Sequence, residues 1–383
     1  MIIKNVKRYT EENRFVDGEI CIKEDLFLSE EEIGKETEII DGEGCYAIPG
    51  LIDLHFHGCM GYDVCDGTKE AIEEIAKYEA SIGVTAICPA TMTLPVDELN
   101  DILATAAEYK KEQENEKKAG RADLIGLNME GPFISPAKKG AQDARNILPC
   151  DKEIAKEFLK ASDGLVKFIG VAPEESDFTT EFIREMKKEV IVSLAHTNAS
   201  FDNADEAFKA GAKHAVHLYN AMTGFTHRDP GVVGAVCENK HVTAELICDG
   251  IHIHPAAVRT TFSMLGNDRI ILISDSMRAT GMTDGIYTLG GLDVKVEGNK
   301  ATLVLDGAIA GSVTNLMECM KTAVQKMEIP LEVAVACATK NPAKCLGVYD
   351  KYGSITAGKK ANLVLLDKEL NVRAIIKDGK RIK

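Results

Sequence analysis

The chain has 383 residues, which is too long for one small domain and suits a barrel of roughly 250 to 300 residues with a smaller module beside it. Apolar residues make up 45% of the chain, enough for a large buried core. The formal net charge of −15 repels phosphate backbones and anionic lipids, so we expect no nucleic-acid or membrane partner. An anionic small substrate would need a local basic pocket.

The N-terminal residues and the cysteines indicate the cellular compartment in which the protein is expected. The start, MIIKNVKRYTEENRF, has no apolar signal-peptide core, and no run of about 18 apolar residues occurs in the chain. The 11 cysteines are scattered, odd in number and form no CxxC pair. So many unpaired thiols suit a reducing compartment, and we expect a cytoplasmic protein. The simplest interpretation of the cysteines is small buried apolar residues, so we assign none to a metal.

Both ends of the chain are predicted to be β-rich. Residues 1–50 contain three short strand patterns, MIIKNVKRY, GEICIKEDLFL and TEIIDGEGCYAIPG, divided by DG and EG turns. The tail, GSITAGKKANLVLLDKELNVRAIIKDGKRIK, alternates in the same way, with turns at DKELN and KDGK. Chain termini of one domain often lie close together. The two ends therefore predict a small β-sandwich domain built from residues 1–50 and 351–383.

The middle, residues 51–350, alternates short apolar runs with amphipathic helical patterns such as TKEAIEEIAKYEASIG and DNADEAFKAG, the second ending at a C-cap signal, Gly211. Eight strands, each followed by a helix or long loop, predict an α/β fold with a (β/α)8 TIM-type barrel. A doubly wound sheet is the alternative, but its glycine-rich phosphate loop is replaced here by His-Phe-His after the first strand. The charged run YKKEQENEKKAGR (109–121) is most simply a solvated helix and its turn. The eight expected strands are Leu51–His55, Val84–Cys88, Leu124–Glu130, Val166–Val171, Val190–Leu194, His214–His217, Thr243–Cys248 and Ile270–Ser274.

Polar residues stand where these strands end, which is the face of a barrel that carries chemistry. Any one histidine there could be a satisfied structural residue. Several imidazoles and carboxylates aimed at one axis are hard to explain by packing, because buried charges are costly unless they are paired or bind a metal. Nitrogen and carboxylate ligands without thiolate predict a divalent metal, Zn²⁺ or Fe²⁺, with an open position for water. The residues concerned are His55, His57, Glu130, His196, His217, Asp249 and Asp275.

Two of these positions allow more than one interpretation. His55 and His57 lie on the same side of an extended strand, so they could hold a second metal, orient the first, or form a structural pair lining the barrel. Asp275 could cap the next helix. Beside a metal, which lowers the pKa of bound water to about 7, it is better interpreted as the group that takes the proton from water and delivers it to the departing nitrogen.

Seven strings, in order along the barrel, resemble the amidohydrolase superfamily and, within it, the N-acetylglucosamine-6-phosphate deacetylase family. PGxxDxHxHG by itself marks only the superfamily, whereas MEGPF, HLYNAM and DGIH together are more specific. The β-rich ends match the small sheet domain of that family. The strings are PGLIDLHFHG (49–58), NMEGPFISPAKKGA (128–141), LAHTNAS (194–200), HLYNAMTGFTHRDPG (217–231), ICDGIHIHP (247–255), LISDSMRATGMTDG (272–285) and AIAGS (308–312).

The resemblance implies a role for each matching residue. Glu130, His196 and His217 would be metal ligands, with one or two metals per subunit, and Asp275 the catalytic acid and base. Arg228 and His252 would hold a 6-phosphate, since Arg gives phosphate a bidentate fork; without the flanking strings, a surface ion pair of Arg228 would be the simpler interpretation. The family is typically dimeric, and the neighbouring subunit would help to complete the phosphate site. The full substrate set would be Ala141, Gln142, Asn220, Ala221, Arg228, His252, Ile309, Ala310 and Gly311.

One residue departs from the family pattern. Family members commonly place His where this chain has Gln142, which keeps hydrogen bonds but carries neither a proton nor a charge, so affinity or preference for the substrate is open. The pair His55 and His57, which some members lack, favours room for two metals. The implied reaction is removal of the acetyl group from a phosphorylated amino sugar. The alternatives are another amidohydrolase acting on a different N-acyl sugar or cyclic amide, and a non-catalytic sugar-phosphate-binding protein, against which the intact ligand and acid/base set speaks.

Overall fold

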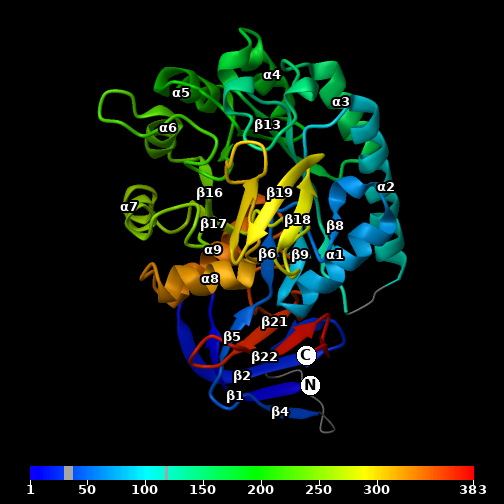
Figure 1. Ribbon diagram of the computed structural model, residues 1–383. Coiled ribbons are helices and arrows are strands. Elements are labelled where there is room, and N and C mark those ends of the chain that lie inside the picture. Colours follow the sequence, from blue (N-terminus) through cyan, green and yellow to red (C-terminus); the bar gives the residue numbers. More distant parts are fainter. Residues whose placement is uncertain (30–37, 117–119) are drawn as a thin grey trace.

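The computed structural model describes residues 1–29, 38–116 and 120–383. Three parts are visible in Figure 1: a sheet at the bottom that contains both termini, a large α/β body above it, and a three-stranded sheet in front of the body. The charged run predicted at 109–121 falls partly on residues outside the described ranges. Its described beginning belongs to the helix α2 (Val96–Asn115).

The α/β body is built on parallel strands. One seven-stranded sheet runs in the order β10-β12-β13-β14-β15-β16-β17, and a three-stranded sheet runs β11-β9-β6. Backbone hydrogen bonds connect the two: Asn128 N donates to Pro89 O at one edge, and Asp275 N donates to His55 O at the other. The parallel sheet is thus curled, consistent with a TIM-type barrel. The strands are β6 (Leu51–Asp53), β9 (Val84–Ile87), β10 (Ala90–Thr91), β11 (Asp123–Leu124), β12 (Leu127–Phe133), β13 (Val166–Val171), β14 (Ile191–Leu194), β15 (His214–Ala215), β16 (Thr243–Ile247) and β17 (Ile270–Ile273).

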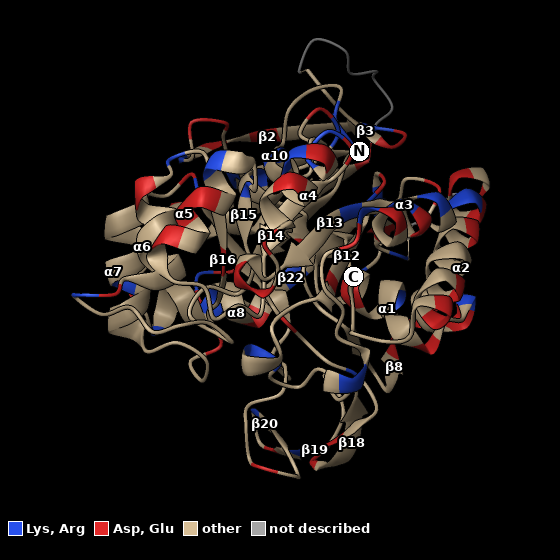
Figure 2. Ribbon diagram, turned by 90° about the horizontal axis from the view of Figure 1, so that it is seen from above, with Lys and Arg blue, Asp and Glu red and all other residues tan. Residues whose placement is uncertain are grey.

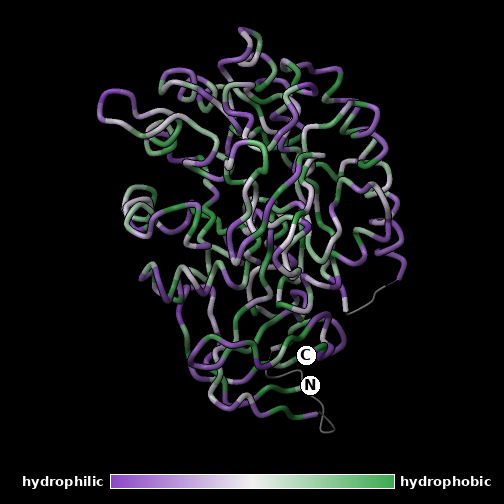
Figure 3. Tube along the Cα trace, in the orientation of Figure 1, coloured by the Kyte–Doolittle hydropathy of each residue, from purple (hydrophilic) through white to green (hydrophobic). Residues whose placement is uncertain are grey.

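Side-chain alternation in these strands divides the core into two layers. In β16, Ala244 and Leu246 pack into the large cluster shared with the helices, whereas Ile247 joins a smaller cluster with Phe168 and Ile271. Figure 3 shows hydrophobic strands in the centre of the body and hydrophilic stretches at its periphery. Both signs of charge occur on the outer helices, as Figure 2 shows for α2 and α3. The helices are α1 (Lys69–Ser81), α2, α3 (Lys152–Ala161), α4 (Thr179–Met186), α5 (Phe201–Ala210), α6 (Gly231–Glu238), α7 (Pro255–Leu265), α8 (Leu316–Gln325), α9 (Leu331–Ala338) and α10 (Lys340–Cys345).

Both ends of the chain join in one sheet. The strand order is β23-β22-β21-β5-β1-β2-β3, with β4 paired to β1. The C-terminal β21 pairs antiparallel with the N-terminal β5 through Val364 and Ile48. The strands are β1 (Ile2–Tyr9), β2 (Phe15–Lys23), β3 (Leu26–Leu28), β4 (Ile39–Asp41), β5 (Tyr46–Pro49), β21 (Leu363–Leu366), β22 (Val372–Lys377) and β23 (Lys380–Arg381).

One part of the fold was missed from the sequence. Residues after Asp275 form an antiparallel sheet in the order β18-β19-β20, which packs a small core around Leu289 and Val294 against the body. A hairpin pattern was nevertheless present in the sequence: Gly290-Gly291 and Gly298 separate stretches in which apolar and polar residues alternate. The strands are β18 (Gly285–Leu289), β19 (Leu292–Glu297) and β20 (Lys300–Leu303), and a two-stranded hairpin, β7 (Gly58–Cys59) with β8 (Tyr62–Asp63), follows the first barrel strand.

Candidate active site

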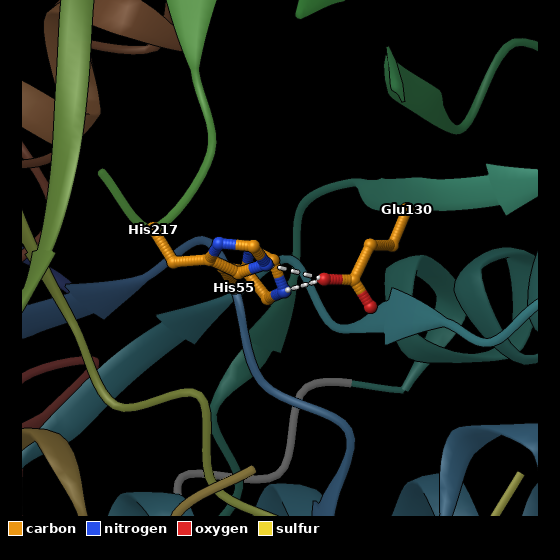
Figure 4. A group of neighbouring side chains, drawn as sticks. All are labelled: His55, Glu130 and His217. Atoms are coloured by element: carbon orange, nitrogen blue, oxygen red, sulfur yellow. Dashed lines mark hydrogen bonds and ion pairs between the residues drawn. The ribbon is translucent and has the colours of Figure 1, made fainter. Parts of the chain in front are cut away.

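The ends of the parallel strands bring one carboxylate and three imidazoles together. Glu130 Oε1, on β12, lies 3.0 Å from His196 Nε2, 2.8 Å from His217 Nε2 and 3.4 Å from His55 Nε2. His196 follows β14, His217 follows β15 and His55 follows β6, so side chains far apart in sequence share one point. Figure 4 shows the His55 and His217 rings directed at the same oxygen of Glu130.

The tautomers of four site histidines are set by the partners of their other ring nitrogen. His55 Nδ1 faces Glu245 Oε2 at 2.9 Å and His57 Nδ1 faces the Ala90 carbonyl at 3.0 Å. His196 Nδ1 faces the Lys138 carbonyl at 2.8 Å, and His217 Nδ1 faces the Asn220 carbonyl at 3.1 Å. An oxygen acceptor requires Nδ1 to donate, so each neutral ring carries its proton there and presents the Nε2 lone pair to the centre. This arrangement is typical of metal-binding histidines.

The donor atoms fit a divalent cation. His196 Nε2 and His217 Nε2 lie 3.2 Å apart, and two lone pairs at that distance repel unless positive charge lies beside them. His55 Nε2 is buried and has no hydrogen-bond partner within the described ranges. Donor atoms of His55, Glu130 and His217 lie within 4.8 Å of one another. Nitrogen and carboxylate donors of this kind suit Zn²⁺ or Fe²⁺.

A second group lies beside the first and shares His55. Donor atoms of His55, His57 and Asp275 also lie within 4.8 Å of one another. His57 Nε2 is 3.3 Å from Asp275 Oδ1 and 3.5 Å from Glu130 Oε2. The two oxygens of Glu130 therefore face different histidines, which is the geometry needed for one carboxylate to serve two neighbouring cations.

The electrostatics of the centre favour positive charge. Burial alone would raise the pKa of Glu130, but the His196 imidazole holds the pKa of that carboxyl well below its usual range. Burial would likewise raise the pKa of Asp275, but the hydrogen bond with His57 lowers it. Although burial lowers the pKa of His55, the carboxylates of Glu245 and Glu130 raise it well above its ordinary value. Both site carboxylates are thus ionised, and their field attracts either protons or a metal cation.

Three site residues have a left-handed backbone, which is uncommon for residues other than glycine. The φ angles are +44° at His196, +25° at His217 and +49° at Asp275. Each of these residues lies two positions after the end of a strand, where the chain turns out of the sheet. Such strained positions cluster at functional sites.

A cavity of about 250 Å³ opens onto this centre. Its lining contains the candidate ligands His57, Glu130, His196 and His217, with Asp275. It also contains most of the residues predicted to contact substrate: Ala141, Gln142, Asn220, Ala221, His252, Ile309 and Gly311. Ala310 is fully buried and does not line the cavity. The cavity is also lined by residues that were not predicted, because their side chains suggest no chemistry: Met92, Gly140, Leu289 and Ala308.

Gln142 is engaged by its neighbours within the cavity wall. Its Nε2 donates to Glu130 Oε2 at 2.6 Å, and its Oε1 accepts from Thr93 N at 2.7 Å. The side chain is almost completely buried. Its amide thereby fixes the orientation of the Glu130 carboxylate, a contact that the sequence did not predict.

The two residues predicted to hold phosphate lie in different places. His252 lines the cavity, and its Nδ1 lies 2.7 Å from Asp249 Oδ2, so its Nε2 is left for the cavity. Burial lowers the pKa of His252, but the Asp249 carboxylate raises it, with a net upward shift that favours the cationic form. Arg228 is exposed on the loop after His217 and is not part of the cavity lining.

With the geometry established, comparison with known proteins identifies the class. The model of the amidohydrolase family matches residues 46–382, and the chain belongs to this family. It is 38% identical to the N-acetylglucosamine-6-phosphate deacetylase of Bacillus subtilis over 326 residues, which covers 85% of this chain and 81% of that protein. It is 32% identical to the N-acetylgalactosamine-6-phosphate deacetylase of Escherichia coli O157:H7, which covers 98% of this chain and 97% of that protein.

A solved structure agrees over the whole chain. The structure of a mutant N-acetyl-D-glucosamine-6-phosphate deacetylase from Mycobacterium smegmatis in complex with N-acetyl-D-glucosamine-6-phosphate superposes with a TM-score of 0.90 and 28% identity. The match covers 100% of this chain and 98% of that chain. The resemblance drawn from the sequence strings is therefore confirmed. Among the described helices, none has both the length and the apolar character needed to cross a membrane.

Proposed function

We propose that this protein is a metal-dependent hydrolase that removes the acetyl group from N-acetylglucosamine 6-phosphate, giving glucosamine 6-phosphate and acetate. The observation that carries the proposal is the set of Nε2 lone pairs converging on Glu130 at the base of a cavity that Asp275 also lines. Relatives similar to the chain over most of its length act on acetylated, phosphorylated amino sugars, as their names state. The alternative of a cyclic amide substrate has no such support.

The metal would be held by Glu130, His196 and His217, with His55 and His57 providing room for a second ion beside Asp275. Zn²⁺ or Fe²⁺ suits these ligands. When bound, such an ion supplies Lewis acidity, which polarises the acetyl carbonyl and acidifies a water molecule.

Asp275 would move the proton. Its carboxylate is ionised, because the hydrogen bond with His57 lowers its pKa, so it can accept the proton of the attacking water. It then delivers this proton to the sugar nitrogen, which leaves as an amine while acetate departs. The backbone bond from Asp275 N to His55 O, 3.0 Å long, holds the carboxylate at the mouth of the metal centre.

The remaining cavity residues would bind and orient the sugar. Ala141, Gln142, Asn220 and Ala221 form one part of the wall, and the segment 309–311 another. His252 would receive the 6-phosphate, because its cationic form is favoured and its Nε2 is free of the bond to Asp249. Arg228 would add a bidentate phosphate contact from a neighbouring subunit, which accounts for its position outside the cavity of its own chain.

Four further features belong to the same proposal. They are a homodimer, a cytoplasmic location, closure of the curled sheet into a complete (β/α)8 barrel, and a division into a catalytic domain (51–350) and a small β-sandwich domain (1–50 with 351–383). The joining of both termini in one sheet supports the domain division, and the backbone bond between the ends of β6 and β17 supports closure.

The test is acetate release from four sugars by purified, metal-analysed protein: N-acetylglucosamine 6-phosphate, its unphosphorylated form, and the two corresponding N-acetylgalactosamine compounds. We expect release that depends on the phosphate and is fastest with N-acetylglucosamine 6-phosphate. Equal release from phosphorylated and unphosphorylated sugars would contradict the phosphate site, and faster release from N-acetylgalactosamine 6-phosphate would contradict the choice of sugar.

A further inference from the structure

Glu245 is a buried charge that the proposed reaction does not use. It lies in the middle of β16, in the sequence Thr-Ala-Glu-Leu-Ile, and its side chain is fully buried. The neighbouring residues Ala244 and Leu246 pack outward against the helices. Glu245 therefore points to the inside of the curled sheet, where an unpaired carboxylate would cost several kcal/mol.

The two oxygens of Glu245 have specific partners in the metal centre and behind it. Oε2 accepts from His55 Nδ1 at 2.9 Å and from the backbone N of His217 at 2.9 Å. Oε1 lies 2.8 Å from His214 Nε2, and His214 Nδ1 lies 2.7 Å from Thr243 Oγ1. One carboxylate thus connects the side chain of one candidate ligand, the backbone of another and a second buried imidazole.

The contacts with His55 and His217 help to orient the imidazole rings of these two residues. The bond to His55 Nδ1 fixes a ring whose Nε2 has no hydrogen-bond partner in the described part of the chain. The bond to His217 N fixes a residue whose φ of +25° is strained, so it holds the turn that aims this imidazole at Glu130. A carboxylate bonded to Nδ1 also makes Nε2 a stronger donor to a cation.

We infer that Glu245 is a positioning residue for the proposed metal centre: it orients His55 and the backbone of His217 so that both imidazoles face Glu130. The inference rests on the metal centre proposed above. Glu245 does not line the cavity, so it acts through the ligands and not on the sugar.

A variant that keeps the shape but removes the charge separates this role from a merely structural one. Glu245→Gln keeps one side-chain oxygen that can accept a hydrogen bond. Its other terminal group is an NH2, which cannot accept a hydrogen bond from the imidazole that it faces. Glu79→Gln is the matched control, because Glu79 on α1 is equally buried and its carboxylate has no hydrogen-bond partner among the described residues. The wild type and both variants are stripped of metal, and their zinc affinity is measured by competition with a chromophoric chelator.

We expect Glu245→Gln to bind zinc about 10- to 100-fold more weakly than the wild type, while Glu79→Gln stays within about twofold. At saturating zinc, the KM of Glu245→Gln for the sugar phosphate should stay within about threefold, since the cavity is intact. Thermal unfolding of the metal-free proteins reports any structural cost. If Glu245→Gln does not fold, Glu245→Asp, which is one methylene too short to reach both His55 and His214, should show the same weakening.

Wild-type zinc affinity in Glu245→Gln, or an equal loss in Glu79→Gln, would overturn the inference while leaving the metal centre in place. An absence of zinc binding in the wild type would overturn the metal centre and the inference with it. Because zinc binding is measured without the sugar, neither result depends on which substrate the enzyme hydrolyses.

Discussion

At the residue scale, Asp275 combines an ionised carboxylate with a fixed position. Its backbone is held by His55, and its side chain lies 3.3 Å from His57 Nε2. It is buried and lines the cavity, so it is placed to act as the proton acceptor of the proposed reaction. The carboxylate is therefore the residue on which turnover should depend most strongly.

Replacing Asp275 by Asn should lower kcat by about two orders of magnitude or more, because an amide accepts no proton. The proposed ligands Glu130, His196 and His217 are untouched, so the metal that they would hold should remain bound as in the wild type. Steady-state kinetics combined with metal analysis gives both values. Near-normal turnover of Asp275→Asn would show that another group carries the proton.

The buried pair of His214 and Glu245 should make stability depend on pH. Burial lowers the pKa of His214, but the Glu245 carboxylate raises it, to about 9 from 6.5. A group whose pKa is raised by folding stabilises the protein fully below its unfolded pKa and loses this contribution as the pH rises through its folded value. The free energy of unfolding contributed by His214 should thus fall between about pH 6.5 and pH 9, by up to about 3 kcal/mol.

Chemical denaturation of the metal-free wild type and His214→Gln at several pH values measures this contribution. We expect the free energy of unfolding of the wild type to decline over that window more steeply than that of the variant. Parallel curves for the two proteins would mean that His214 does not carry the extra proton in the folded state.

The sequence predicted the residues at the strand ends but not the residues behind them. His55, Glu130, His196 and His217 could be found because each stands at the edge of an apolar run. Glu245 stands inside such a run. The one feature that could have indicated a role for it is its charge in an otherwise apolar strand. The contact of Gln142 with Glu130 depends on how two distant segments pack, which no local pattern records.

At the scale of elements, a buried ion cluster joins the terminal sheet to the α/β body. Lys377 Nζ on β22 lies 3.1 Å from Asp123 Oδ1 on β11, and Lys360 Nζ lies 2.8 Å from Asp123 Oδ2. Tyr352 also donates to Asp123 Oδ2 at 2.8 Å. Lys377 is fully buried, and its ion pairs with Asp123 and Asp378 offset the cost of removing its ammonium group from water.

Lys377→Met should lower the free energy of unfolding by about 3 kcal/mol, because it leaves Asp123 buried with one cation fewer. The control is Lys4→Met in the same sheet, where the pair with Glu19 is exposed on both sides and should change stability by less than about 1 kcal/mol. Denaturant unfolding compares them. Equal effects of the two substitutions would contradict a joining role for the Asp123 cluster.

The strands of the α/β body were predictable because each is a short apolar run bounded by polar residues. Val166–Val171 was predicted with the same bounds as β13, and Gly211 is the C-cap of α5, as expected. Strands also ended earlier than predicted, as at His214–Ala215, because the chain turns out of the sheet before His217. The sheet β18–β20 was overlooked, since its alternation follows the last barrel strand, where a helix or loop was expected.

At the scale of the whole molecule, the protein carries a net charge of −15 yet is proposed to bind a phosphorylated sugar. A negative field repels such a substrate, so cationic side chains must gather at the cavity. Within one chain His252 is placed there, whereas Arg228 is exposed outside the lining. A second chain is therefore expected to supply the missing positive charge.

The protein should accordingly sediment at twice the 41.6 kDa of the chain. Arg228→Ala should raise the KM for the phosphorylated sugar by about tenfold or more, while leaving the kinetics with the unphosphorylated sugar nearly unchanged. Analytical ultracentrifugation and steady-state kinetics measure the two effects. A monomer with full activity would contradict the shared phosphate site, and an unchanged KM would remove Arg228 from it.

The most direct test of the central claim is a metal titration of acetate release. Chelator-stripped protein is titrated with Zn²⁺ in the presence of N-acetylglucosamine 6-phosphate, and acetate release is measured against zinc bound. We expect the stripped protein to be inactive and its activity to rise in proportion to the bound metal until the site is filled. Full acetate release by metal-free protein, or none by fully loaded protein, would contradict metal-dependent deacetylation at this centre.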